Sequence, residues 1–169
     1  RHIHPVKPEA KHEGKTMKIT YIGHATLLIQ TQGVNFVTDP VWSNRASPVK
    51  WAGPRRFTAP GVRLHDLPKL DFVILSHNHY DHMDIVTLKK LSRRDHMPIY
   101  TGLGNKQYLE DRGVKNVIDM DWWDTEKIGE SEITFIPSQH FSARGITDRN
   151  KTLWGGFAWK IGSRTGYFA

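Results

Sequence analysis

The sequence predicts one α/β domain in which a mixed β-sheet is covered on its outside by helices. A β-rich stretch with tight turns comes first and is typical of an antiparallel meander. Strand-like and helix-like segments then alternate, an order that is typical of parallel strands joined by crossover helices. The chain has 169 residues, of which 38% are hydrophobic, so it is long enough to bury one core.

The first sixteen residues predict a flexible N-terminal arm, and residues 17–169 predict the folded domain. The arm is polar and contains three histidines, His2, His4 and His12, interspersed with Pro5 and Pro8. Such a tract is a weak metal-binding signal, and a mobile terminal segment is the interpretation we favour.

The meander is predicted from three β-rich runs at residues 17–22, 25–30 and 34–38, separated by glycine-containing turns. Residues 39–68 follow, rich in proline, glycine, tryptophan and arginine, with little periodicity. A structureless loop of this length is uncommon inside a compact domain, so we expect it to be functional.

Residues 70–76 form a continuous apolar run, which predicts a strand that is buried on both faces. Asp84 predicts an N-cap for a helix over residues 85–94. Further elements are expected in this order: a strand at 98–101, a helix at 105–112, and strands at 116–119, 132–137, 154–161 and 165–169. Residues 141–152 are expected to be a loop.

Composition excludes some classes of site. The chain has no cysteine, so disulfides and thiolate metal sites are excluded. It carries a formal net charge of +7, and part of this charge is concentrated in the long loop, at Arg45, Lys50, Arg55, Arg56 and Arg63. Such a patch attracts phosphate groups of nucleic acids or lipids, although a solvated basic loop explains it equally well.

The strongest chemical signal follows the buried strand, in the run Ser76-His77-Asn78-His79-Tyr80-Asp81-His82. His77 and His79 are two residues apart, so on an extended segment they share a side. Asp81 and His82 come where the chain turns into the helix, at the carboxyl end of the strand, where open α/β sheets place their sites. Imidazole and carboxylate ligands suit zinc, iron or manganese, so the run predicts a metal centre.

The pattern His-x-His-x-Asp-His after a hydrophobic strand resembles the hallmark of the metallo-β-lactamase superfamily. Further motifs resemble its branch of N-acyl-phosphatidylethanolamine-hydrolysing phospholipases D: Gly23-His24-Ala25-Thr26, Thr38-Asp39-Pro40, Arg45-Ala46-Ser47-Pro48, Gly53-Pro54-Arg55-Arg56-Phe57, Asp121-Trp122-Trp123 and Pro137-Ser138-Gln139-His140. The resemblance implies an αββα sandwich whose second half is incomplete here, because the superfamily's bridging aspartate and final histidine would lie beyond Ala169. We therefore expect the remainder of the chain or a homo-oligomer to complete the site.

The resemblance also implies roles for individual residues. It implies two divalent metal ions, most simply zinc, with iron or manganese as alternatives, although the fragment alone could bind fewer. His77, His79 and His140 are implied as ligands of the first ion. Asp81 and His82 are implied as ligands of the second. Asp81 is also the expected catalytic carboxylate, which orients or deprotonates water.

Supporting positions are expected at Asp39 and His24. Asp39 matches the acidic residue that holds the ligating histidines, and an Asp-Pro turn is the alternative. His24 either faces the site or is a turn histidine. Tyr80 is expected to pack in the core or line a pocket. Four tryptophans could line an apolar groove, although we favour the core for at least two of them: Trp42, Trp51, Trp122 and Trp123.

The implied function is that of a metal-dependent hydrolase, a phosphodiesterase that cleaves phospholipid-like substrates through attack by metal-bound hydroxide. Two alternatives stay open: a lactonase or ribonuclease with the same metals, and an inactive scaffold that binds a partner. We expect a small-molecule or phospholipid substrate, contact with a membrane surface, and no nucleic acid. The compartment is expected to be cytoplasmic or membrane-associated.

Overall fold

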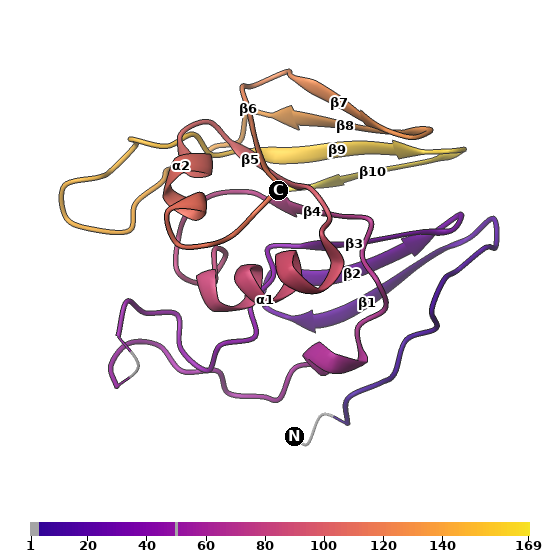
Figure 1. Cartoon of the computed structure of the whole chain (residues 1–169), viewed down its shortest axis with the longest axis horizontal. Helices are drawn as coiled ribbons and strands as arrows, with labels where there is room; N and C mark the ends of the chain where they lie inside the picture. The colour runs from indigo at the N-terminus through magenta and orange to yellow at the C-terminus, as the bar shows by residue number, and fades with distance from the viewer. Residues whose placement is uncertain (1–3, 50) are drawn as a thin grey trace.

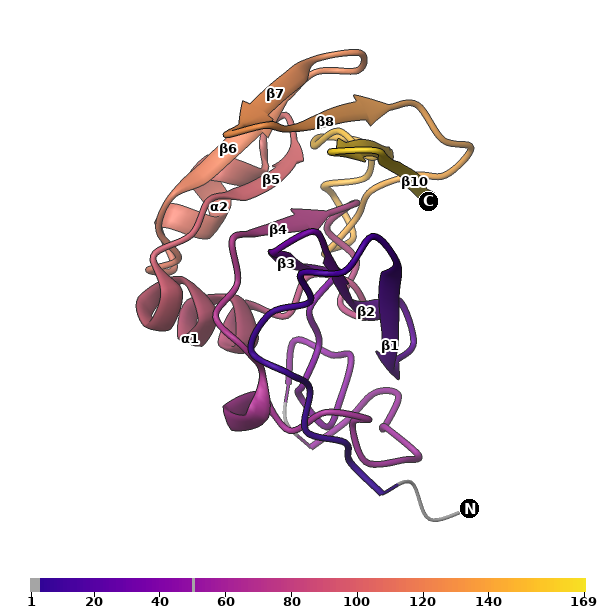
Figure 2. The same ribbon diagram turned by 90° about the vertical axis from the view of Figure 1, so that its right-hand side faces the viewer.

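The computed structural model describes residues 4–49 and 51–169, and these residues build two β-sheets that pack face to face (Figures 1 and 2). One sheet has six strands in the order β1-β2-β3-β4-β5-β6, and the other has four in the order β10-β9-β8-β7. The helices α1 and α2 lie on the side of the six-stranded sheet that faces away from the second sheet (Figure 2). This arrangement confirms the expected mixed sheet and the sandwich.

The first half of the large sheet is the predicted antiparallel meander of β1 (Met17–Gly23), β2 (Thr26–Thr31) and β3 (Val34–Thr38). Tight turns join these strands, and the turn between β1 and β2 places His24 in a left-handed conformation, with φ at 53°. A side chain other than glycine is uncommon there, so the hairpin holds His24 in a costly backbone conformation.

The second half of the large sheet is parallel, as predicted. Its elements are β4 (Phe72–Leu75), α1 (Ile85–Asp95), β5 (Ile99–Gly102), α2 (Asn105–Glu110) and β6 (Val117–Met120). The cap of α1 is confirmed, because the Asp84 carboxylate accepts hydrogen bonds from the backbone N–H groups of Val86 and Thr87. This cap fixes the point at which the chain turns from the histidine run into the helix.

The second sheet is antiparallel and consists of β7 (Thr125–Ile128), β8 (Ser131–Ile136), β9 (Gly156–Ile161) and β10 (Arg164–Phe168). Sequence reasoning missed β7. Its four residues, Thr-Glu-Lys-Ile, are polar apart from the last, and it lies at the edge of the sheet beside β8. An edge strand needs no apolar face on both sides, so it leaves little hydrophobic signal in the sequence.

Two separate cores hold the layers together, and β4 contributes to both by strand alternation. Val73 and Leu75 pack with the helices, whereas Phe72 and Ile74 pack between the sheets. The ring of Phe72 stacks on that of Phe36 with centroids 4.5 Å apart. Each such buried side chain stabilises the fold by about 1.5–3 kcal/mol, so the strand that carries the histidine run is firmly anchored.

The segment that precedes β1 forms no helix or strand in residues 4–16 but bonds to the domain. The N–H of Val6 donates to the carbonyl of Gly61, and the N–H of Gly33 donates to the carbonyl of His12. The His12 ring contacts Glu9 and Thr16 and belongs to none of the donor clusters in the described residues. His2 lies outside the described residues, and the mobility of the arm stays a prediction.

The long loop between β3 and β4 has little regular structure, as expected, apart from a bridge between Arg45 and Arg55 and a 3-10 turn at Leu64–Asp66.

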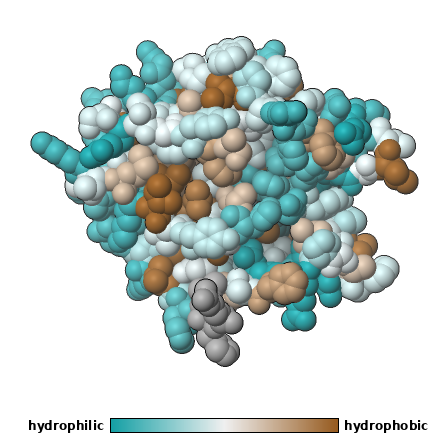
Figure 3. Space-filling model, turned by 180° about the vertical axis from the view of Figure 1, so that it is seen from behind, coloured by the Kyte–Doolittle hydropathy of each residue, from teal (hydrophilic) through white to brown (hydrophobic). Residues whose placement is uncertain are grey.

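One face of the molecule shows hydrophobic side chains in small groups surrounded by hydrophilic ones (Figure 3). Within residues 4–49 and 51–169, neither helix has the length and apolar character needed to cross a membrane.

Candidate metal centre

The histidine run lies at the carboxyl end of β4, and its first two histidines converge. Nε2 of His77 lies 2.9 Å from Nδ1 of His79. The rings meet edge to face with their centroids 4.5 Å apart. The predicted shared side of the two histidines is therefore confirmed, and it results from the extended backbone that continues beyond the strand.

His140 completes this group from the other sheet. It follows β8, and its Nε2 lies 3.1 Å from Nε2 of His77 and 3.3 Å from Nδ1 of His79. One nitrogen from each of the three rings lies within 4.8 Å of the others. The sandwich thus brings a histidine of the small sheet against two histidines of the large sheet, and the three form one potential tridentate site.

A second donor group adjoins the first and consists of His24, Asp81 and His82. Nε2 of His24 lies 2.9 Å from Oδ2 of Asp81, and Nε2 of His82 lies 3.7 Å from the same oxygen. His24 therefore stands among the donor atoms themselves and does not only support them. Its hairpin reaches the site because the β1–β2 turn and the run after β4 lie at the same end of the large sheet.

Asp39 is linked by hydrogen bonds to a histidine of each group, directly to His82 and through Ser76 to His77. Asp39 is fully buried, and its Oδ1 accepts a hydrogen bond from the backbone N–H of Ser76 at 2.7 Å. Its Oδ2 accepts one from the Ser76 hydroxyl and lies 2.6 Å from Nδ1 of His82. Asp39 thus bonds to His82 directly and to His77 through Ser76, and its supporting role at a metal centre stays a prediction.

The hydrogen-bond network assigns the protons on two imidazole rings. The Ser76 hydroxyl gives its proton to Asp39, so Nδ1 of His77, 2.8 Å away, donates to the Ser76 oxygen. Nδ1 of His82 likewise donates to Asp39. When each ring is neutral, Nε2 carries the free lone pair, and that nitrogen faces the donor cluster.

Burial and mutual repulsion keep His77 neutral. Desolvation, followed by the positive charges that His82, His79 and His140 can carry, lowers the pKa of His77 to about 2. Desolvation and His140 also lower the pKa of His79. For His82, desolvation opposes the charged form, but the hydrogen bond and charge of Asp39 outweigh it and raise the pKa. A lowered pKa favours the neutral ring that binds a cation, so His77 and His79 are suited to metal binding.

The donor set fits a divalent metal. Three imidazole nitrogens point at one another at distances of 2.9–3.3 Å, and His77 has no proton on Nε2 to share with the other two. Imidazole is a common ligand for zinc, iron and manganese, and three ring nitrogens this close together can bind one cation between them. Asp81 and His82 would hold a second ion, together with His24.

Arg144 is a site residue that sequence reasoning missed. One of its Nη atoms donates to the carbonyl oxygens of Asn78 and Met83, at 2.7 and 2.9 Å, and so clamps both ends of the histidine run. Its guanidinium lies 3.9 Å above the ring of Tyr80, which lines a cavity, one of the two placements that were expected. Arg144 lies in an aperiodic loop, where the sequence carries no signal for such a contact.

The tryptophans divide into two pairs. Trp42 packs against the helix-side core and Trp122 against the core between the sheets, which confirms the prediction that at least two are core residues. Trp51 and Trp123 are exposed, at 82% and 70%. Two cavities lie near the donor groups, one of about 300 Å³ and one of about 760 Å³, and no tryptophan lines either of them. Neither cavity is therefore the predicted tryptophan-lined groove.

Comparison with known proteins places the chain in a family. The family model described as "Beta-lactamase superfamily domain" matches residues 34–169. N-acyl-phosphatidylethanolamine-hydrolyzing phospholipase D 1 of Caenorhabditis elegans is 35% identical over 176 residues, which cover 98% of this chain and 49% of that protein. The chain thus spans about half the length of this relative.

Solved structures agree on the fold. A metallo hydrolase from the archaeon Ignicoccus hospitalis superposes with a TM-score of 0.63 at 21% identity, covering 90% of this chain and 60% of that one. A metallo-β-lactamase fold protein from Bacillus subtilis superposes with a TM-score of 0.52 at 20% identity, covering 88% and 59%. With the two-sheet architecture and the family match over residues 34–169, the chain belongs to the β-lactamase superfamily and has the metallo-β-lactamase fold.

Proposed function

We propose that the protein is a metal-dependent hydrolase that cleaves phosphodiester bonds in phospholipid-like substrates. The observation that carries this proposal is the pair of adjoining donor groups, one of three histidines and one of His24, Asp81 and His82. The name of the Caenorhabditis elegans relative, a phospholipase D acting on N-acyl-phosphatidylethanolamine, supports the substrate class.

The residues divide the work as follows. His77, His79 and His140 would hold one ion, and His82, Asp81 and His24 a second. When bound, such ions lower the pKa of water and neutralise charge that develops on phosphoryl oxygens. Asp39 fixes the orientation of His82, and through Ser76 that of His77.

Asp81 is the proposed general base. Its side chain is 46% exposed, so it can reach water, and its Oδ2 lies 2.9 Å from Nε2 of His24. A carboxylate in this position that holds an ion through one oxygen can accept a proton from the attacking water through the other. This role agrees with the catalytic residue expected from the sequence.

The cavity beside Asp81 supports an amphiphilic substrate. It has a volume of about 300 Å³ and is lined by His24 and Asp81 at the chemical end. Apolar side chains of Tyr21, Val41 and Phe57 line it elsewhere, and Arg55 adds a positive charge. A phosphodiester with an attached apolar chain matches this combination of charge and apolar surface.

Metal analysis and substrate screening test the proposal together. We expect purified protein to contain bound zinc, iron or manganese, with His77→Ala losing most of it and His65→Ala retaining it. His65 is the matched control because its side chain is 74% exposed and belongs to neither donor group. Hydrolysis of N-acyl-phosphatidylethanolamine in mixed micelles should follow the metal content.

Other substrates decide between the alternatives. Micellar phosphodiester should be cleaved faster than RNA or a lactone at equal concentration. Faster cleavage of RNA, with strong salt dependence of binding, would replace the lipid substrate by nucleic acid. Protein that carries no metal and cleaves none of the three substrates would favour the scaffold alternative and end the proposal.

A further inference from the structure

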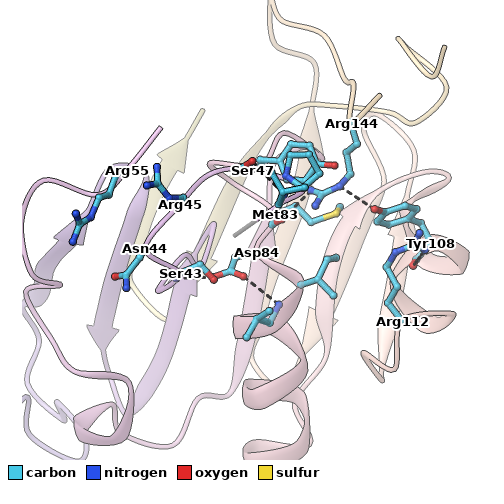
Figure 4. Close-up of a pocket in the computed structure, with 15 residues that line it drawn as sticks. Ser43, Asn44, Arg45, Ser47, Arg55, Met83, Asp84, Tyr108, Arg112 and Arg144 are labelled. Carbon is cyan, nitrogen blue, oxygen red and sulfur yellow. Dashed lines mark hydrogen bonds between the residues drawn. The ribbon is translucent and has the colours of Figure 1, made fainter. Parts of the chain in front are cut away.

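A second and larger cavity lies beside the donor groups and contains none of their residues (Figure 4). Its volume is about 760 Å³, within the range of small-molecule sites. Its walls come from the long loop, the start of α1, the helix α2 and the loop that carries Arg144. Tyr80, between two residues of the donor groups, is the nearest link to the metal centre.

The lining of this cavity is strongly basic. Four arginines contribute to it, Arg45, Arg55, Arg112 and Arg144, against a single carboxylate, that of Asp84. Arginine carries a permanent positive charge, so the groups repel one another across the cavity unless an anion lies between them.

The Asp84 carboxylate is already occupied by bonds within the protein. Its Oδ1 accepts from the N–H of Val86 at 3.1 Å, and its Oδ2 accepts from the Thr87 hydroxyl at 2.6 Å and from the N–H of Ser43 at 2.9 Å. These partners fix it as the cap of α1, and no hydrogen bond joins it to the four arginines in residues 4–49 and 51–169. The basic charge of the cavity is therefore left to an external anion.

Two of the arginines are held rigidly by aromatic rings. The guanidinium of Arg112 lies 3.6 Å from the ring centre of Tyr108 and donates to the Tyr108 carbonyl at 3.0 Å. Arg144 stacks on Tyr80, and its Nε donates to the Tyr108 hydroxyl at 3.1 Å. Such stacking fixes the guanidinium planes, so little side-chain entropy is lost when an anion binds.

The other two arginines come from the long loop, and Arg55 also lines the smaller cavity beside Asp81. Figure 4 shows Arg45 and Arg55 on one side and Arg112 and Arg144 on the other, next to Tyr108. One Nη of Arg45 donates to the carbonyl of Gly53. Arg55 makes no hydrogen bond through its side chain to any residue in 4–49 or 51–169. Donors thus remain free on both sides.

We infer that this cavity is an anion site for a phosphate monoester, distinct from the metal centre. Paired guanidinium groups match phosphate oxygens two at a time, and a dianionic phosphate would neutralise much of the charge that Asp84 leaves uncompensated. The phosphate could belong to a soluble metabolite or to a lipid headgroup. The inference does not depend on the proposed phosphodiesterase activity.

The test is titration calorimetry of the metal-loaded chain with glycerol 3-phosphate. Two variants remove one arginine from each side, Arg45→Gln and Arg112→Gln, and neither residue contacts the histidine run. Each should weaken binding about tenfold, which corresponds to about 1.4 kcal/mol, because one charge-assisted contact to the phosphate is lost. Arg93→Gln is the matched control, because Arg93 is exposed in the last turn of α1, outside the cavity.

Flotation with vesicles that contain phosphatidic acid distinguishes the two sources of phosphate. Binding to glycerol 3-phosphate alone identifies a soluble ligand, and arginine-dependent flotation identifies a lipid headgroup; both support the site. The variant His77→Ala should still bind the phosphate. The inference is overturned if neither probe binds, or if both cavity variants bind the phosphate as tightly as the wild type. It is also overturned if His77→Ala alone abolishes binding, because the anion would then bind at the metal centre.

Discussion

Oδ2 of Asp39 lies 2.6 Å from Nδ1 of His82, and the two residues are separated by 43 positions in the chain. The carboxylate is completely buried, so no water competes for this contact. The same oxygen accepts the hydroxyl of Ser76, which in turn bonds to His77. One carboxylate at the end of β3 therefore orients histidines of both donor groups.

Replacing Asp39 by asparagine should weaken metal binding without removing any proposed ligand. An amide has one acceptor oxygen where the carboxylate accepts three hydrogen bonds, and its NH₂ group would meet a donor. We expect a loss of about 10–100-fold in metal affinity, measured by competition with a chelator of known affinity.

The control for this variant is Asp71→Asn, at the other end of β4, where the carboxylate accepts from the backbone N–H of Asn35 at 2.8 Å. It should lower stability in urea but leave metal affinity unchanged. Equal metal affinity in Asp39→Asn and wild type would contradict the orienting role of Asp39.

The stability of the metal-free protein should fall in mild acid because of His77. Its pKa is about 2 in the folded state, lowered mainly by burial, against 6.5 for the ordinary group. The unfolded chain therefore binds this proton more readily, so the contribution to stability is complete above pH 6.5 and is lost as the pH falls toward 2. At pH 5 the loss is about 2 kcal/mol from this one group.

Urea unfolding of chelator-treated protein at pH 7.5 and pH 5 measures this effect, with His77→Gln as the reference, because glutamine does not titrate. The wild type should lose about 2 kcal/mol more than the variant between the two pH values. Parallel losses in both proteins would show that His77 is not kept neutral by the fold.

Removing the Arg144 clamp should loosen the histidine run. Arg144→Ala deletes the bonds to the carbonyls of Asn78 and Met83 and leaves both acceptors without that partner. We expect faster amide exchange in residues 78–83 and a loss of about 1.5–3 kcal/mol in stability. Arg149→Ala is the control, since Arg149 is in the same loop and its guanidinium stacks 4.1 Å from the ring centre of Phe141. A similar change in exchange for both variants would argue against a clamp.

The core between the sheets should be sensitive to the loss of one ring. Phe36 is fully buried and contacts both Phe72 and Trp159, so it joins β3 to the second sheet. Phe36→Ala should cost about 3–5 kcal/mol in the free energy of unfolding. Phe57→Ala, at a fully exposed position, should change stability by no more than about 0.5 kcal/mol. Thermal and urea unfolding of the two variants make the comparison.

Local patterns in the sequence were enough to predict most strands and the core of the site. The apolar run before Ser76 marked β4, and Asp84 marked the start of α1. The two-residue spacing of His77 and His79 predicted their shared side, because alternation in an extended chain is a local property. The edge strand β7 was not predicted because most of its residues are polar.

The sequence by itself determined which residues could bind metal, because residue type and short spacing can be read directly from it. Only the tertiary structure decided how they meet. His140 reaches His77 across 63 positions because two sheets pack together, and His24 joins Asp81 across 57 because of the β1–β2 turn. Arg144 donates a hydrogen bond to the carbonyl of Asn78 in the same run, from a loop whose sequence has no periodic pattern. Such contacts depend on strand order and sheet packing, which long-range burial sets and which no short segment encodes.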